Sequence, residues 1–387
     1  MVRVAINGYG RIGRIAHRVI ILSHSDDAEV VAINAGSSTD ITGWMYLLKY
    51  DTTYGQLPDV EISVKKAEEM TLPFTSETPL IGAIVVNGKE IPVFSGREPE
   101  KLPWKDLAVD VVIESTGAFT TEEGLQKHIT AGAKAAILSA PYKDEASGST
   151  YVLGVNLAQD GSGSMPTVVS NASCTTNCIA PIAKVIEDTF GIEKAMMTTI
   201  HAYTSDQSLQ DGGHKDYRRA RAAAQNIIPT SSGATKAAAK AIPSLEGKFN
   251  GLAIRVPVVT GSLSDFTFLI KRDTTVDEVN HALEEAAKQP GYEGILQTTH
   301  DPLVSSDIIG NYHSSIADLS LTQVVGGNMV KVIAWYDNEF GYSNRLVEET
   351  VLLGRQVSPG GSGSAQQPDS GSQQTPTENT PPVSPLM

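Results

Sequence analysis

The stretch Val2-Arg3-Val4-Ala5-Ile6-Asn7-Gly8-Tyr9-Gly10-Arg11-Ile12-Gly13 decides the fold. Its first six residues read as a buried strand, and a G-x-G-x-x-G motif then leads into a helix expected over Arg11–Ser23. In this motif Gly8 permits a tight turn, Gly10 lets a pyrophosphate approach the backbone, and Gly13 lets helix and strand pack closely. A structural glycine turn would also fit the motif alone. The strand–turn–helix context favours a dinucleotide site at the helix N-terminus.

Outward from this motif, short apolar runs alternate with helical spacing up to about Asn171. That alternation predicts a doubly wound parallel sheet, an α/β Rossmann domain, with helices on both faces. The expected strands after the first are Val30–Asn34, Val109–Glu114 and Ala135–Ser139, and the next expected helix is Thr121–Ala131.

After Cys174 the pattern changes to longer β-rich runs with fewer helices, which predicts an α+β second domain with a mixed or antiparallel sheet. The expected strands are Gly251–Val259, Ser264–Lys271 and Met329–Tyr336, and the expected helices are Thr175–Thr189, Ala234–Ala241 and Val276–Gln289. We expect a dinucleotide-binding domain over 1–172, a catalytic and oligomerisation domain over 173–337, a helix over 338–355 that returns to the first domain, and a disordered tail over 356–387.

Composition limits the function. The 387 residues are 41% hydrophobic, with a formal net charge of −14, which argues against binding to nucleic acid or to an anionic membrane. No run of about 18 apolar residues predicts a membrane span. The two cysteines, Cys174 and Cys178, exclude a disulfide scaffold and favour a cytoplasmic setting. They also lack the further ligands that a zinc site needs, so no metal is expected.

The end of the second strand departs from the usual dinucleotide pattern. A carboxylate that bonds the ribose 2′-hydroxyl is expected there, but the strand ends in Asn34 and continues Ala35-Gly36-Ser37-Ser38. Either the site does not bind a dinucleotide, or a 2′-phosphate is tolerated because no carboxylate repels it. The residues alone leave both alternatives open.

Two further motifs carry candidate chemistry. In Ser170–Cys178, Cys174 stands directly before a helical apolar pattern, where the helix N-terminus favours thiolate over thiol. Cys178 falls one turn further on and is interpreted as a small buried residue. His201 follows an apparent strand and is a candidate base for the thiol. Arg255 lies inside an apolar run, where a charge needs a buried partner or an anion.

These motifs together resemble the phosphorylating glyceraldehyde-3-phosphate dehydrogenase family, type I, from Met1 to about Arg355. The blocks that carry the resemblance are INGYGRIGR (6–14), ESTGAFT (114–120), SNASCTTNC (170–178), HAYTSDQ (201–207), RRARAAAQNIIPTSSGATKA (218–237) and WYDNEFGYSNR (335–345). The resemblance implies oxidation and phosphorylation of glyceraldehyde 3-phosphate through a cysteine thioester, with hydride transfer to NAD or NADP, in a homotetramer that also binds inorganic phosphate.

The resemblance also implies roles for particular residues. Cys174 would be the nucleophile and His201 its base. The residues implied to bind the dinucleotide are Asn7, Gly8, Gly10, Arg11, Ile12, Gly13, Asn34, Ala35, Arg97, Ser115, Thr116 and Asn338. Those implied to bind the substrate phosphate or inorganic phosphate are Ser173, Thr175, Thr204, Asp206, Ser232, Gly233 and Arg255. Arg218 and Arg219 are interpreted as interface or solvated residues.

Four features depart from the family pattern. Ala35 replaces the usual ribose-binding Asp, and Gly212-Gly213 stands where NAD-specific members have Leu-Pro, so we expect use of both NAD and NADP. The stretch 68–79 resembles an insertion. The tail has no counterpart in the common enzyme and contains no cysteine. The alternatives are an erythrose-4-phosphate dehydrogenase, or a surface or binding protein that retains the fold.

Overall fold

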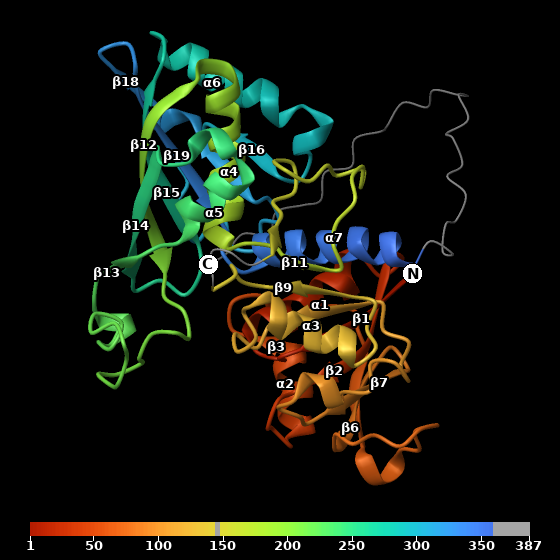
Figure 1. Ribbon diagram of the computed structural model, residues 1–387. Helices are drawn as coiled ribbons and strands as arrows, with labels where there is room; N and C mark the ends of the chain where they lie inside the picture. Colours follow the sequence, from red (N-terminus) through yellow and green to blue (C-terminus); the bar gives the residue numbers. More distant parts are fainter. Residues whose placement is uncertain (144–147, 359–387) are drawn as a thin grey trace, which may run out of the picture.

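The computed structural model describes residues 1–143 and 148–358 and contains two large sheets (Figure 1). The first has nine described strands, parallel except at the β6 and β5 edge. Their order across the sheet is β10 (Ser149–Thr150), β11 (Val168–Ser170), β9 (Ala135–Leu138), β8 (Val111–Glu114), β1 (Val2–Asn7), β2 (Ala28–Asn34), β7 (Lys89–Phe94), β6 (Leu80–Val86) and β5 (Ile62–Lys66). This confirms the predicted α/β fold class.

Helices cover both faces of this first sheet. Alternate residues of β1 point to opposite faces: Val4 and Ile6 pack with α1 (Arg11–Ser23) and α7 (Phe340–Val357), whereas Ala5 packs with α3 (Glu122–Thr130) and Trp104. The sequence pattern did not indicate α2 (Ile41–Lys49) or the β3 (Tyr50–Asp51) and β4 (Gly55–Gln56) hairpin. The apparent insertion contains a short helix, Ala67–Glu69, and otherwise connects β5 to β6 outside the sheet.

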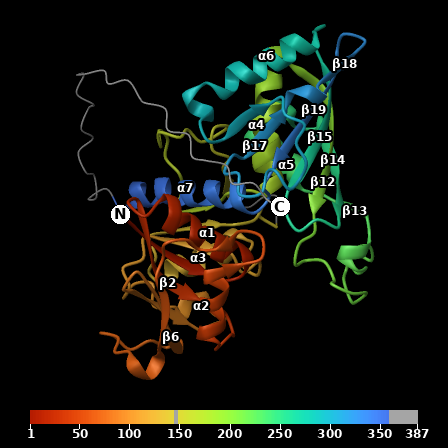
Figure 2. The ribbon, with the colours of Figure 1, turned by 180° about the vertical axis from the view of Figure 1, so that it is seen from behind.

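The second sheet is mixed, as expected, and its helices lie on one face only (Figures 1 and 2). Its strand order is β13 (Ile228–Ser231), β14 (Phe249–Val256), β12 (Ile192–Ala202), β15 (Ser262–Ile270), β19 (Met329–Tyr336), β17 (Ser315–Asp318) and β16 (Leu296–Thr299), with β18 (Gln323–Val325) beside β19. The covering helices are α4 (Cys174–Phe190), α5 (Ala234–Ala241) and α6 (Val276–Ala287). Within residues 1–143 and 148–358, no helix covers the opposite face.

Helix α7 lies across the first sheet, where it packs on α1 and β1 (Figure 1). The helix runs to Val357, so the expected boundary of an ordered chain at 355 is too early. Gln356 donates from Nε2 to the Met165 carbonyl, and Ser358 donates to Asp110 at 2.7 Å. These contacts hold the first residues of the expected tail. Residues 359–387, the rest of the expected disordered tail, lie outside the described residues.

The glycines of the opening motif separate into two kinds. A Cβ on Gly8 (φ 95°) would lie 2.6 Å from the amide nitrogen of Thr116, and a Cβ on Gly13 would lie 2.3 Å from the Gly8 carbonyl oxygen. A Cβ on Gly10 would meet nothing within 4 Å. Two glycines therefore serve backbone packing, and Gly10 leaves open space in front of the helix.

This difference predicts opposite effects of two matched substitutions. Gly13→Ala forces a methyl group against backbone, so we expect the free energy of unfolding to fall by about 1–3 kcal/mol. Gly10→Ala meets no atom and is expected to change it by no more than about 0.5 kcal/mol. Denaturant unfolding of both variants measures the difference. Equal losses would contradict the distinction.

Candidate active site

The start of α1 forms an anion cradle at the carboxyl ends of β1 and β8. The helix begins at Arg11, and no side chain caps it at Gly10. The first amides of a helix have no acceptor within the helix, and they carry the positive end of its dipole. The space in front of Gly10 lets a phosphate approach these amides. The residues present therefore fit a dinucleotide pyrophosphate.

The loops beside this cradle are bonded to one another. Ser115 donates to the Gly8 carbonyl at 2.7 Å, and Thr116 lies against Gly8. Asn34 Nδ2 donates to Asn7 Oδ1 at 2.6 Å. The structure thus brings these predicted site residues together at the ends of three adjacent parallel strands, where doubly wound folds bind their ligands.

Arg97 lies beside the end of the second strand. Asn34 exchanges two hydrogen bonds with Gly96, at 2.9 and 3.0 Å, so the exposed Arg97 is held close to Ala35. No lysine or arginine adjoins Ala35 in the sequence. In the fold, β2 pairs with β7, and Arg97 follows β7, so this pairing provides a cation for a 2′-phosphate. Asp40, the N-cap of α2, is a nearby carboxylate, and its negative charge would repel a 2′-phosphate.

The guanidinium of Arg11 faces carboxylates rather than the cradle. It donates to Glu339 at 2.8 and 2.6 Å and also pairs with Asp51. Only the backbone amide of Arg11 is left for an anion at the helix start. If Arg11 has the role implied by the family resemblance, its main chain is the part available for it.

Asn338 follows the last strand of the second sheet and is nearly fully buried. Its Oδ1 accepts hydrogen bonds from Ser262 Oγ (2.8 Å), Gly261 N (3.2 Å) and Thr260 Oγ1 (3.3 Å). Three donors on one oxygen fix the orientation of this amide, so its Nδ2 is presented on the other side as a donor.

Cys174 is the first residue of α4, and its Sγ lies 3.4 Å from Nε2 of His201 at the end of β12. The cysteine packs against the hydrophobic cores of both sheets, so the pair lies at the boundary between them. Ser173 caps the helix by accepting from Thr176 N at 3.0 Å. The structure therefore brings the two predicted catalytic residues into contact.

Arg255 and the backbone orient the imidazole. Nδ1 of His201 lies 2.7 Å from the Ala202 carbonyl, and Arg255 Nη1 donates to the same carbonyl at 2.9 Å. Arg255 Nη1 also lies 2.8 Å from Nδ1, and one nitrogen cannot both donate to Ala202 and accept from Arg255. The shorter contact favours a proton on Nδ1. The lone pair of Nε2 then points at the thiol.

Burial sets the charge state of the pair. Burial raises the pKa of the Cys174 thiol above its ordinary value, and the nearby Arg255 charge and the Thr175 hydrogen bond lower it only in part. Burial, together with the charge of Arg255, lowers the pKa of His201 to about 3. Burial thus favours the thiol, in the direction opposite to the effect of the helix N-terminus. A thiol faces a neutral imidazole, which is able to accept its proton.

The starts of two helices meet beside the cysteine. Thr176 Oγ1 donates to the Ala234 carbonyl at 3.3 Å, which brings the uncapped start of α5, at Gly233, next to that of α4. Ser232 accepts from Ala234 N at 3.3 Å. Thr175 exchanges a hydrogen bond with the Tyr336 hydroxyl at 2.9 Å, so its side chain is held beside Cys174.

Asp206, one of the residues implied to bind phosphate, lies in an ion pair. Asp206, a carboxylate that would repel phosphate, pairs with Arg219 at 2.5 Å in the loop that also carries Thr204. Both charges act on Arg255. The sequence analysis interpreted Arg219 as an interface or solvated residue. The acidic partner thirteen residues before it was the available signal, but only the loop conformation brings the two together.

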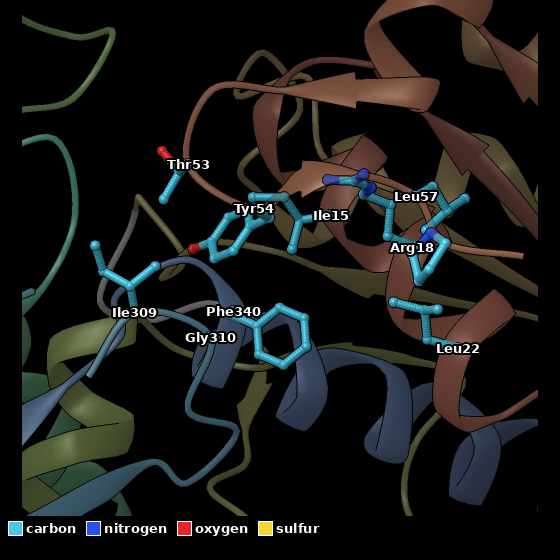
Figure 3. A pocket seen from close by; sticks show the side chains of 10 residues that line it. Ile15, Arg18, Leu22, Thr53, Tyr54, Leu57, Ile309, Gly310 and Phe340 are labelled. Carbon is cyan, nitrogen blue, oxygen red and sulfur yellow. The ribbon is translucent and has the colours of Figure 1, made fainter. Parts of the chain in front are cut away.

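A separate cavity of about 400 Å³ lies between α1, the segment around Tyr54 and the start of α7 (Figure 3). Ile15, Leu57, Ile309 and Phe340 give it an apolar lining, and neither Cys174 nor His201 borders it. It is therefore distinct from the thiol–imidazole site.

A doubly wound sheet with a helix-start anion cradle, next to a partly buried cysteine in contact with a buried histidine, defines a class of dinucleotide-dependent enzymes that act through a thiol. The comparisons with known proteins specify the family. Residues 2–122 match the family described as glyceraldehyde 3-phosphate dehydrogenase, NAD binding domain, and residues 173–338 match its C-terminal domain. The chain belongs to the glyceraldehyde-3-phosphate dehydrogenase family.

Relatives match this chain over nearly its whole length. It is 50% identical over 356 residues to glyceraldehyde-3-phosphate dehydrogenase 2 of Streptomyces avermitilis, which covers 92% of this chain and 99% of the relative. It is 48% identical over 353 residues to glyceraldehyde-3-phosphate dehydrogenase 2 of Trichormus variabilis, with 91% and 98% covered. The glyceraldehyde-3-phosphate dehydrogenase of Mycobacterium avium is 48% identical over 360 residues, with 92% and 99% covered.

The two cysteines should differ sharply in alkylation. Cys178 is fully buried, and burial raises its pKa to about 12, so we expect iodoacetamide to label Cys174 alone in the native protein. Because the pKa of Cys174 is raised, its labelling rate should climb through the alkaline range without a plateau near pH 6–7. Peptide mass spectrometry locates the label, and Cys178→Ser, the matched control, should react as the wild type does. Labelling of Cys178, or a plateau below pH 7, would contradict this assignment.

Proposed function

We propose that this chain oxidises and phosphorylates glyceraldehyde 3-phosphate to 1,3-bisphosphoglycerate, with Cys174 as nucleophile and His201 as base. The observation that carries the proposal is the 3.4 Å contact between Sγ and Nε2 at the boundary between the two sheets. Family membership supports the substrate, since the relatives bear the name of this activity. The division into domains at 172 and 173, and at 337 and 338, is part of the same proposal.

The protein's own residues carry out the proton transfers. His201, neutral at physiological pH, takes the proton of Cys174 as the sulfur bonds to the aldehyde carbon. The bound nicotinamide supplies the acceptor for the hydride that leaves that carbon, and the substrate is oxidised to a thioester on Cys174. Inorganic phosphate then attacks the thioester carbon, the carbon–sulfur bond breaks, and the thiolate is released together with an acyl phosphate. The imidazolium of His201 stabilises the oxyanion in this second half.

Phosphate groups are held by hydroxyls, amides and Arg255. We assign the substrate phosphate and the attacking phosphate to the region of Ser173, Thr175, Thr204, Ser232, Gly233 and Arg255. The joined helix starts at Cys174 and Gly233 supply amide donors there. We assign Asp206 a positioning role, since it pairs with Arg219 and a carboxylate does not bind phosphate.

For the dinucleotide we assign Asn7, Gly8, Gly10, Arg11, Ile12, Gly13, Asn34, Ala35, Arg97, Ser115, Thr116 and Asn338. We further propose that NADP is accepted in addition to NAD. Ala35 places no carboxylate near the ribose, and Arg97 offers a cation that pairs well with a phosphate. Asp40 opposes this effect from the start of α2, so tolerance of both cofactors is expected rather than strict preference for NADP.

A homotetramer is the proposed assembly. The face of the second sheet that no helix covers exposes Met196 and Leu252, which are 60% and 43% exposed. The loop between β12 and β13 projects from the body of the protein (Figure 1) and exposes Leu209 and Tyr217 by 82% and 86%. Apolar side chains in such positions are typical of subunit interfaces.

We also propose a cytoplasmic setting, because both cysteines are free.

No helix in the parts of the chain that the structure describes, 1–143 and 148–358, is both long and apolar enough to cross a membrane.

Steady-state kinetics test the reaction. We expect turnover of glyceraldehyde 3-phosphate that depends on inorganic phosphate and exceeds turnover of erythrose 4-phosphate. Cys174→Ser should lower kcat by at least about 10³-fold, because a hydroxyl is a far weaker nucleophile than a thiolate, whereas Cys178→Ser should retain most of it. Higher activity with erythrose 4-phosphate would favour the erythrose-4-phosphate dehydrogenase alternative. No activity with either aldehyde would favour a binding protein.

Cofactor choice is tested with a pair of charge changes. Ala35→Asp should depress kcat/KM for NADP much more than for NAD, because the new carboxylate repels the 2′-phosphate. Arg97→Gln should lower NADP use by about tenfold or more, since a charge-assisted hydrogen bond contributes about 1.5–3 kcal/mol. Arg218→Gln, a change of an exposed arginine elsewhere, is the control for net charge. A wild type that is strict for NAD would refute dual use.

A further inference from the structure

Three fully buried polar side chains lie beneath the dinucleotide cradle, and the proposed reaction uses none of them. Trp104, His128 and Glu114 are each 0% exposed. Trp104 lies in the loop after a short helix (Pro99–Lys101), His128 is in α3, and Glu114 is the last residue of β8. A polar chain buried this deeply costs free energy unless every group has a partner.

The direction of each hydrogen bond in this chain follows from its first member. The indole N–H of Trp104 only donates, and it donates to Nδ1 of His128 at 3.1 Å. Nδ1 is therefore an acceptor, the imidazole is neutral, and its proton is on Nε2. That proton is donated to Glu114 Oε2 at 3.0 Å. Trp104 thus fixes the tautomer of His128 that faces Glu114.

Glu114 joins the two loops that border the cradle. Its Oε2 also accepts from Asn7 Nδ2 at 2.5 Å, and its Oε1 accepts from the amide and the hydroxyl of Thr116 at 2.8 and 2.5 Å. Asn7 ends β1 and Thr116 follows β8, and the two loops meet at Gly8. One carboxylate therefore sets the spacing of both walls of the site.

Among the described residues, all hydrogen-bond partners of Glu114 are neutral donors, and no lysine or arginine is among them. A buried carboxylate without a cation depends on every donor it has. Loss of the His128 donor would leave Oε2 with Asn7 alone, so Glu114 would reorient and the Asn7 and Thr116 loops would shift with it.

We propose that Trp104, His128 and Glu114 form a buried positioning relay that holds Asn7 and Thr116 in the geometry that binds the nicotinamide dinucleotide. The inference rests on the proposed function, because it requires that the dinucleotide binds at this cradle. The relay touches neither Cys174 nor His201 in any of its hydrogen bonds. Its effect should therefore fall on cofactor affinity and leave the chemistry of the thiol unchanged.

The experiment measures NAD binding to the full-length protein by isothermal titration calorimetry. His128→Leu removes the donor to Glu114 and should raise the Kd for NAD by about tenfold or more, as expected for the loss of a hydrogen bond to a charged group. His128→Gln keeps a donor at the position of Nε2 and should restore most of the affinity. Trp104→Phe keeps a large ring but frees the tautomer, so an intermediate rise of about threefold to tenfold is expected.

A matched control comes from the second sheet. Trp335 is also buried, and its indole N–H donates to the carboxylate of Asp318 at 3.1 Å. Trp335→Phe thus removes an equivalent hydrogen bond away from the cradle and should leave the Kd for NAD within twofold of wild type. In all relay variants the alkylation rate of Cys174 without cofactor, and kcat at saturating NAD, should also stay within about twofold.

The outcomes separate the relay from a structural role and from the proposed function. An unchanged Kd in folded His128→Leu, or an equal loss in His128→Gln and His128→Leu, overturns the relay. If His128→Leu does not fold, the test rests on Trp104→Phe. A rise in the Kd for NAD no larger than that of Trp335→Phe then overturns the relay. If the wild type binds no NAD, the proposed function fails first and the relay fails with it.

Discussion

Ala172 has a left-handed backbone (φ 54°) two residues before Cys174, and the geometry of the active site depends on it. A residue other than glycine in this conformation costs about 1–3 kcal/mol and persists only where its surroundings hold it. Here Asn177 Nδ2 donates to the carbonyls of Asn171 (2.9 Å) and Ser173 (3.1 Å), and the Tyr342 hydroxyl donates to that of Ala172 at 3.3 Å. The sharp turn they hold ends β11 and starts α4 with the thiol at its first position.

Sequence patterns predicted the fold well where local signals agree. The strands at 2–7 and 329–336 and the helices at 11–23 and 234–241 have the predicted bounds, because apolar periodicity and turn residues coincide there. The candidate base and nucleophile were also predicted, but not their charge state. Burial is a property of the folded chain, and it raises the pKa of Cys174, in the direction opposite to the effect of the helix N-terminus. The Arg219–Asp206 pair and the relay were missed, because their partners are separated in the sequence and meet only in the fold.

The electrostatics of the protein oppose its proposed ligands. A net charge of −14 repels phosphates at long range, so binding depends on short-range donors. The structure offers such donors at the uncapped start of α1 and at the adjoining starts of α4 and α5, and the partly buried Arg255 is the cation we assign to this region. Amides and the guanidinium act strongly on an anion because they contact it. The surface carboxylates lie further away, and salt screens their field. Local geometry therefore determines anion binding here more than net charge does.

Arg11 shows how the two halves of the site are joined. Its backbone opens the helix that forms the cradle, while its side chain bonds Glu339, the residue directly after Asn338. Asp337, on the other side of Asn338, accepts from the Tyr54 hydroxyl at 2.9 Å and from the amides of Glu339 and Phe340. Asn338 thus lies between two carboxylates, one bonded to the start of α1 and the other to the turn of the β3–β4 hairpin. A movement of the cradle would act on this amide through bonded groups, so the two ends of the proposed dinucleotide site are positioned together.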